Sequence, residues 1–190
     1  MSGSGVELKM DNLFFERPIL NSPYKYPARY WELDEHGQPT NAARLLFGRD
    51  PQRFLPCAEV RCMHFHGTEI QRPVPFYRIF KGTVFGQVDM AVDFVMSKLN
   101  RSVGTRAESN QAPVRDEIPH DVLREAIVNA VAHRDYTSAG AVQVSVFADR
   151  VEVWNPGTLP ASLTTESLRH PHGSIPRNHR LCEVLFSPGI

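Results

Sequence analysis

Apolar side chains recur along the chain with two periods, and these periods predict a mixture of strands and helices. Alternation of apolar and polar residues over 58–66, and again over 76–80, predicts two strands, each followed by a glycine. Apolar residues every three or four positions over 84–100 predict an amphipathic helix. The polar stretch 101–116 has no period, and we expect it to be a loop.

The second half of the chain predicts another helix and then a hairpin. The helix follows Pro119, a residue that suits the first turn of a helix, and is expected to run to about Arg134. Valines alternate over 142–146 and again over 151–153, which is the pattern of a β-hairpin. The second strand of this hairpin should end at the turn Asn155-Pro156-Gly157.

Shorter elements and an N-terminal arm complete the predicted organisation. Asn41 can cap a short helix, and two further short helices are predicted over 164–168 and 180–186. Residues 1–40 contain prolines and aromatic residues but no helical or strand period, which favours an extended arm. The predicted division is therefore an arm over 1–40 and one domain over 41–190.

Composition narrows the class of protein. The chain has 190 residues, which suits one domain of typical size plus a tail. Its 21 basic and 21 acidic residues cancel, so a basic surface for binding DNA is not expected. An odd number of cysteines at irregular spacing favours a reducing compartment, and no apolar run or signal-peptide pattern suggests a membrane. A cytoplasmic location is expected.

The helix after Pro119 carries the residues with most chemical interest. Glu125 and Asn129 lie four residues apart, so they project from the same side of the helix. The surrounding positions are mostly apolar, namely Val122, Leu123, Ala126, Ile127, Val128, Ala130 and Val131. A carboxylate and an amide oxygen at this spacing can bind one ligand. The spacing alone favours a solvated edge, or a hydrogen bond between the two side chains, over a ligand site.

Longer strings of residues resemble a known family. REAIVNAVAHRDY at 124–136 is followed by the valine hairpin and then by VEVWNPGTLP at 151–160. Further similar strings are NAARLLFGRDPQRF at 41–54, KGTVFGQVDMAVDFV at 81–95 and SIPRNHRLCEVLF at 174–186. Together they resemble the RecG-C-terminal-like ATPase domain, a branch of the GHKL superfamily that includes DNA gyrase, MutL and sensor histidine kinases. The resemblance implies an α+β fold, a two-layer α/β sandwich of the GHKL ATPase type, preceded here by the extended arm.

The resemblance also implies roles for particular residues. In the superfamily, the glutamate of the helix orients or deprotonates the attacking water, which assigns catalysis to Glu125. The asparagine one turn later ligates Mg²⁺ on the phosphates of ATP, which assigns the metal to Asn129. An aspartate before a glycine-bearing turn accepts the adenine amino proton, and Asn155 and Gly157 hold the corresponding places. His133 is a further candidate for contact with the nucleotide.

Two departures from the family bear on the expected activity. The usual aspartate is an asparagine here, and Pro156 removes a backbone donor from the turn. A glycine-rich lid over the phosphates follows in relatives, whereas this sequence stops at residue 190. We therefore expect a domain truncated at its C-terminus, with little or no hydrolysis.

The predicted function is an ATP-binding, regulatory module related to RecG-like putative DNA helicases and transcriptional regulators. The expected partners are a nucleotide and either a protein partner or a second copy of the chain, with DNA bound only through modules outside this sequence. The alternative is a non-catalytic scaffold fragment that binds no nucleotide. Residues 10–40 resemble the start of the helicase-type subunit of type III restriction systems, which suggests a gene-fusion remnant.

Three other groups of polar residues have weaker patterns. Cys62, His64 and His66 lie on one face of a predicted strand, but the paired spacings of a zinc site are missing. Residues 133–135 end the Glu125 helix, and capping of its C-terminus is favoured over phosphate contact. The last group has two interpretations, a polar patch near the nucleotide or a solvated loop. It consists of His170, His172, Arg177 and Asn178.

Overall fold

The structure, a computed structural model, describes residues 34, 36, 38–103, 114–170, 173 and 175–187. Nearly all of the predicted arm therefore lies outside the described residues. The described part contains a four-stranded sheet, a separate pair of short strands and four α-helices. The fold is thus a mixed α+β arrangement.

A mixed sheet forms one layer of the domain. Its strands are β1 (Val60–His64), β2 (Phe76–Phe80), β5 (Val142–Val146) and β6 (Val151–Trp154). They are ordered β2-β1-β5-β6, with β1 parallel to β5 and each outer strand antiparallel to its neighbour. The predicted hairpin of β5 and β6 therefore meets a second antiparallel pair, β1 and β2, along β1 and β5 at the centre of the sheet.

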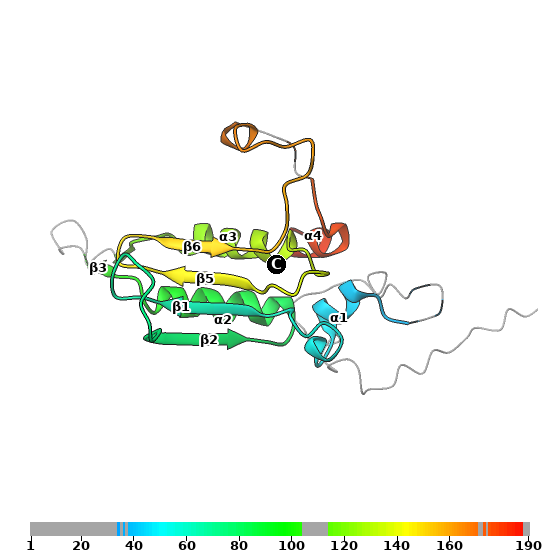
Figure 1. Cartoon of the computed structure of the whole chain (residues 1–190), viewed down its shortest axis with the longest axis horizontal. Helices are drawn as coiled ribbons and strands as arrows, with labels where there is room; N and C mark the ends of the chain where they lie inside the picture. The colour runs from blue at the N-terminus through cyan, green and yellow to red at the C-terminus, as the bar shows by residue number, and fades with distance from the viewer. Residues whose placement is uncertain are drawn as a thin grey trace, which may run out of the picture.

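Two long helices cover one face of this sheet (Figure 1). Helix α2 (Val84–Met96) packs on β1 and β2, and α3 (His120–Ala132) packs on β5 and β6 and against α2. Alternate strand residues, including Val60 and Val144, enter the core between the layers. The shorter helices α1 (Asn41–Phe47) and α4 (His179–Leu185) contact each other, α1 packing also on α2 and α4 on α3.

The other face of the sheet lacks such a helical cover among the described residues. Trp154 at the end of β6 is 64% exposed, and Tyr77 and Ile79 of β2 are also exposed. Within the described part of the chain, no helix has the length and apolar character needed to cross a bilayer.

Several predicted boundaries are wrong. The expected loop 101–116 contains strands β3 (Arg101–Val103) and β4 (Val114–Asp116), which pair with each other. Three-residue strands are too short to show an alternating pattern, so periodicity missed them. Helix α2 ends at Met96 rather than near residue 100, with Ser97 at its C-cap. The short helix expected at 164–168 is a 3₁₀ turn, η4 (Ser167–Arg169).

The predicted cap of α1 is also one residue out. Thr40, not Asn41, is the N-cap, and its hydroxyl accepts a hydrogen bond from the Ala43 N–H at 3.3 Å. The Asn41 side chain instead accepts a hydrogen bond from Arg44 within the first turn.

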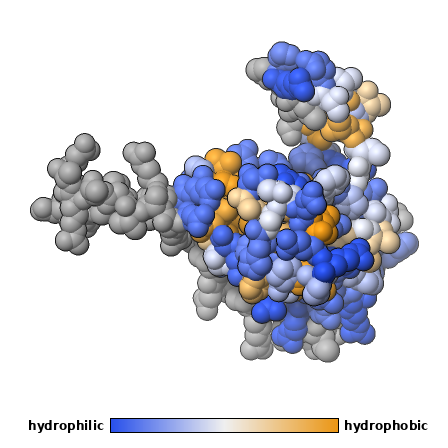
Figure 2. Space-filling view, turned by 60° about the vertical axis from the view of Figure 1, so that its left-hand side comes forward, coloured by the Kyte–Doolittle hydropathy of each residue, from blue (hydrophilic) through white to orange (hydrophobic). Residues whose placement is uncertain are grey.

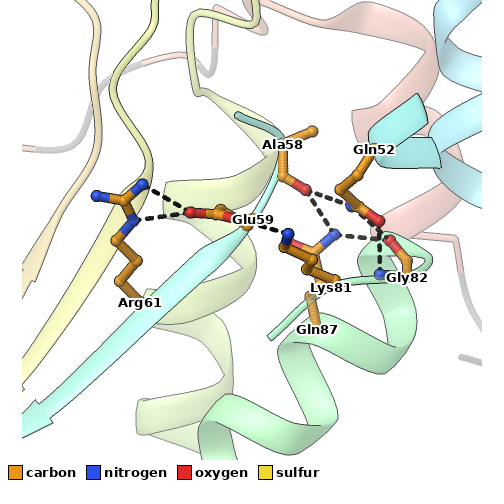
Figure 3. A network of polar contacts seen from close by, with 7 residues as sticks. All are labelled: Gln52, Ala58, Glu59, Arg61, Lys81, Gly82 and Gln87. Carbon is orange, nitrogen blue, oxygen red and sulfur yellow. Dashed lines mark hydrogen bonds and ion pairs between the residues drawn. The ribbon is translucent and has the colours of Figure 1, made fainter. Parts of the chain in front are cut away.

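A buried polar network fixes the corner where β1 and α2 begin (Figure 3). Gln87 donates to the carbonyls of Ala58 at 3.0 Å and Gly82 at 2.8 Å, and the Gln52 amide oxygen accepts from the Gly82 N–H at 2.8 Å. Glu59 is buried and forms a 2.7 Å ion pair with Arg61, whose pKa is raised chiefly by this hydrogen-bonded carboxylate. Because each buried polar group of this network has a partner, the network can fix the position of α2 against the sheet.

Candidate nucleotide site

Helix α3 presents two side chains of the candidate site. Glu125 is exposed and Asn129 is half-buried, while Leu123, Ile127 and Val131 on the opposite side are buried in the core. Of the apolar neighbours predicted for the pair, Val122 and Ala126 are exposed. One face of α3 therefore anchors the helix, and the other is available to a ligand.

The turn after β6 lies beside the C-terminal end of α3. The Asp135 N–H donates to the Pro156 carbonyl at 2.8 Å, which holds the turn against the residues that follow the helix. Gly157 has a φ of +150° in a region that other residues rarely adopt, so a side chain here would be strained. Asn155, the exposed residue at the start of this turn, is thereby placed next to α3.

A cavity of about 820 Å³ opens between α3, this turn and the end of α4. The residues predicted to bind nucleotide come together on it, because Glu125, Asn129, His133, Asn155 and Gly157 all line its wall. Further lining residues come mainly from the segment that follows the turn, namely Thr158, Leu159, Pro160, Leu163, Gly173, Ile175 and Arg177, and Phe186 closes the far side. The volume falls within the range of roughly 300–1,000 Å³ that is common for small-molecule sites.

The polar side chains on this wall are not engaged with one another. Among the described residues, Glu125, Asn129, His133 and Asn155 make no side-chain hydrogen bond, so the local Glu125–Asn129 bond left open above is not formed. A carboxylate, two amides and an imidazole thus face one cavity with their donors and acceptors free. Such groups retain their full capacity for a polar ligand.

The C-terminus of α3 is capped by a residue from far along the chain. The Asn178 amide donates to the carbonyls of Ala132 at 2.9 Å and Arg134 at 2.7 Å. Of the residues 133–135 predicted to cap this helix, His133 stands at the C-cap, and its N–H donates to the Asn129 carbonyl at 2.9 Å. Arg134 adds no cap, because it is buried, donates to the Gly140 carbonyl and lies over the ring of Tyr136. Burial lowers the pKa of Arg134.

The sequence left Arg177 undecided between a polar patch near the nucleotide and a solvated loop. In the structure it lines the cavity. Its guanidinium donates to the Thr158 carbonyl at 2.6 Å and lies 3.7 Å from the Asp135 carboxylate. Hydrogen bonds from the Thr137 hydroxyl and N–H, aided by the charge of Arg177, lower the pKa of Asp135. His170 forms a 3.9 Å contact with Glu166 outside the cavity, and His172 lies outside the described residues.

The cavity residues fit a nucleotide with its Mg²⁺. Mg²⁺ prefers oxygen ligands and commonly takes one or two from protein with the rest from phosphates and water. Asn129 and Glu125 offer such oxygens, unpaired and one helical turn apart. The described residues hold no group of three or more histidine, cysteine or acidic side chains able to bind a metal by themselves. Phosphate oxygens would have to complete the coordination.

Cys62 and His64 lie in β1 and His66 two residues beyond it, but they form no group of three that could hold a metal in the described part of the chain. Cys62 is fully buried in the core, and burial raises the pKa of its thiol to about 12. His64 and His66 instead pack around the ring of Phe76, with centroid distances of 5.6 Å and 5.8 Å.

Comparisons with known proteins support an ATPase-type domain. The family described as "Putative ATP-dependent DNA helicase recG C-terminal" matches residues 140–190, which include Asn155 and Gly157 but not Glu125 or Asn129. The crystal structure of the DIP2311 protein from Corynebacterium diphtheriae superposes with a TM-score of 0.60 at 24% identity over 80% of this chain. This chain covers 30% of that protein's length. No curated protein sequence matches the chain.

These comparisons define a class. The chain contains a domain similar to the RecG C-terminal ATPase type, on an α+β fold shared with the DIP2311 protein.

Proposed function

We propose that this domain binds ATP with Mg²⁺ in the cavity between α3 and the 155–157 turn, as a GHKL-type regulatory module. One observation carries the proposal: four polar side chains without partners, Glu125, Asn129, His133 and Asn155, converge on a single cavity of about 820 Å³. A cavity of this size with a few convergent polar side chains among apolar ones is the usual form of a small-molecule site.

The geometry suggests where the parts of the nucleotide lie. Asn155 lines the same cavity as the apolar side chains Leu159 and Ile175, which suit a flat base. Its carboxamide has both an acceptor and donors, so it can accept from the adenine amino group and donate to a ring nitrogen. Asn129 and Glu125, on the helix wall, then face the phosphates and their cation.

Binding rather than rapid turnover is the proposed role. Glu125 is the group placed to accept a proton from water, but no described residue hydrogen-bonds its carboxylate. A general base works well when a neighbouring group fixes its orientation, and a mobile exposed carboxylate gains less. Slow hydrolysis with a stable bound state suits a domain whose nucleotide regulates a partner, such as a protein or a second copy of the chain.

Isothermal titration calorimetry with ATP, GTP and CTP tests this function. We expect ATP to bind with Mg²⁺. The comparison with GTP and CTP reports how strictly Asn155 selects the base, because a carboxamide can turn to present either its oxygen or its nitrogen. Gln143→Ala is a matched control, since Gln143 is an exposed amide on the opposite face of the sheet. It should leave affinity unchanged, whereas Asn155→Ala should lower it.

The rival function, a scaffold that binds no nucleotide, draws on the exposed apolar face of the sheet. Trp154 and Ile70 border a second cavity there, of about 630 Å³, with Met63 and Val74. Saturating ATP that produces no heat and no thermal stabilisation would favour this rival.

A further inference from the structure

Arg177 stands at the base of the segment that projects from the body of the domain. This segment leaves the sheet after β6, carries η4 and returns to α4 (Figure 1), and it forms the protruding lobe in the space-filling view (Figure 2). The Arg177 guanidinium joins its two stems, because one nitrogen, Nη2, donates to both the Thr158 carbonyl at 2.6 Å and the Thr158 hydroxyl at 3.2 Å.

The other nitrogens of Arg177 are available. Neither Nε nor Nη1 makes a hydrogen bond with the described residues, and the Asp135 carboxylate is 3.7 Å from Nη1, too far for one. Nε lies against Gly157, where an added Cβ would come within 3.6 Å of it. The glycine thus leaves open space beside the free edge of the guanidinium.

Charge around the cavity singles out the same residue. Among the described residues that line it, Arg177 is the one with a permanent positive charge, and Glu125 is the one with a negative charge. Arg177 is one-third exposed, so water and ligands can reach it. A polyphosphate entering this cavity would find its compensating charge from the protein there.

We infer that Arg177 is the phosphate-binding residue of the cavity, donating to phosphate oxygen through Nε or Nη1 while Nη2 stays on Thr158. This inference rests on the proposed nucleotide function. With Nη2 occupied, the guanidinium binds phosphate through single charge-assisted hydrogen bonds from Nε or Nη1, and a group already fixed by its bonds to Thr158 loses little freedom when it makes another. Asp135 competes for the same guanidinium, so phosphate binding exchanges a long, exposed ion pair for a closer one.

The test compares ligands with and without phosphates by calorimetry on the full chain. Arg177→Gln should weaken ATP binding at least tenfold and leave adenosine binding within twofold of wild type. Arg177→Lys keeps the charge but loses the fixed donor directions of the guanidinium, and we expect an intermediate loss. Asp135→Asn removes the competing carboxylate and should tighten ATP binding severalfold. Arg169→Gln is the matched control, because Arg169 is exposed on the same segment but does not line the cavity.

Each outcome decides between distinct possibilities. Equal losses of adenosine and ATP in Arg177→Gln would show that Arg177 only holds the stems together, and unchanged ATP affinity would exclude it as a phosphate ligand. Either result overturns the inference. If wild type binds neither adenosine nor ATP, the proposed function itself fails. If wild type binds both with equal affinity, the base is recognised but the phosphates are not, which overturns the role of Arg177 alone.

Discussion

The strongest structural prediction concerns Asn178, which ties the last turn of α3 to the start of α4. Its amide donates two hydrogen bonds, at 2.9 Å to the Ala132 carbonyl and 2.7 Å to the Arg134 carbonyl, and both are partly buried. Asn178→Ala removes both donors and leaves two carbonyls at a helix end without their partner. At about 1 kcal/mol for each bond, the expected loss is about 2 kcal/mol of unfolding free energy. For a chain of this size this corresponds to a drop of about 4–8 °C in Tm.

Urea unfolding followed by far-ultraviolet circular dichroism measures this loss, with calorimetry for the Tm. Asn178→Asp is the informative second variant, because it keeps the shape of the side chain but replaces the donors with a carboxylate facing two carbonyl oxygens. It should destabilise the domain at least as much as alanine. Asn155→Ala is a control, since the Asn155 side chain is exposed and has no described partner. A loss below about 0.5 kcal/mol for Asn178→Ala would refute the view that this cap holds α3 in place.

Four further predictions concern the cavity and the core. Asn129→Ala should weaken Mg·ATP binding more than metal-free ATP binding. Equal losses in titrations with and without Mg²⁺ would show that Asn129 does not bind the cation. Glu125→Gln should bind ATP as wild type does but lose any phosphate release, because the amide cannot act as a base; release at the parent rate contradicts this. Gly157→Ala should lower stability by about 1 kcal/mol, measured by urea unfolding, through strain at φ +150°. In native protein at pH 8, iodoacetamide should modify Cys57 well before the buried Cys62, whose pKa is raised to about 12; equal rates would show that the core opens readily.

The long periodic elements were predictable because their patterns are local. The 3.6-residue period of α3 and the alternation of the 142–146 strand each extend over enough residues to be recognised, and both elements form. The parallel pairing of β1 with β5 could not be predicted in this way. It joins residues about eighty positions apart, and nothing in either strand specifies its partner.

The residues of the candidate site also differ in how local their contacts are. Glu125 and Asn129 could be placed together because residues four apart share a helix face. Arg177 was left undecided and the cap by Asn178 was missed, since both act on residues 19 to 46 positions away, on Thr158 and Ala132. Contacts of this length depend on how the segment after β6 folds back, which no local period encodes.

Photocrosslinking with 8-azido-ATP, followed by peptide mapping, tests the central claim most directly, because it reports both binding and its location. The account predicts labelling within residues 155–163 or 173–177 that depends on Mg²⁺ and is prevented by excess ATP. Labelling confined to the exposed face of the sheet around Trp154 and Ile70, or labelling that ATP does not prevent, would contradict it.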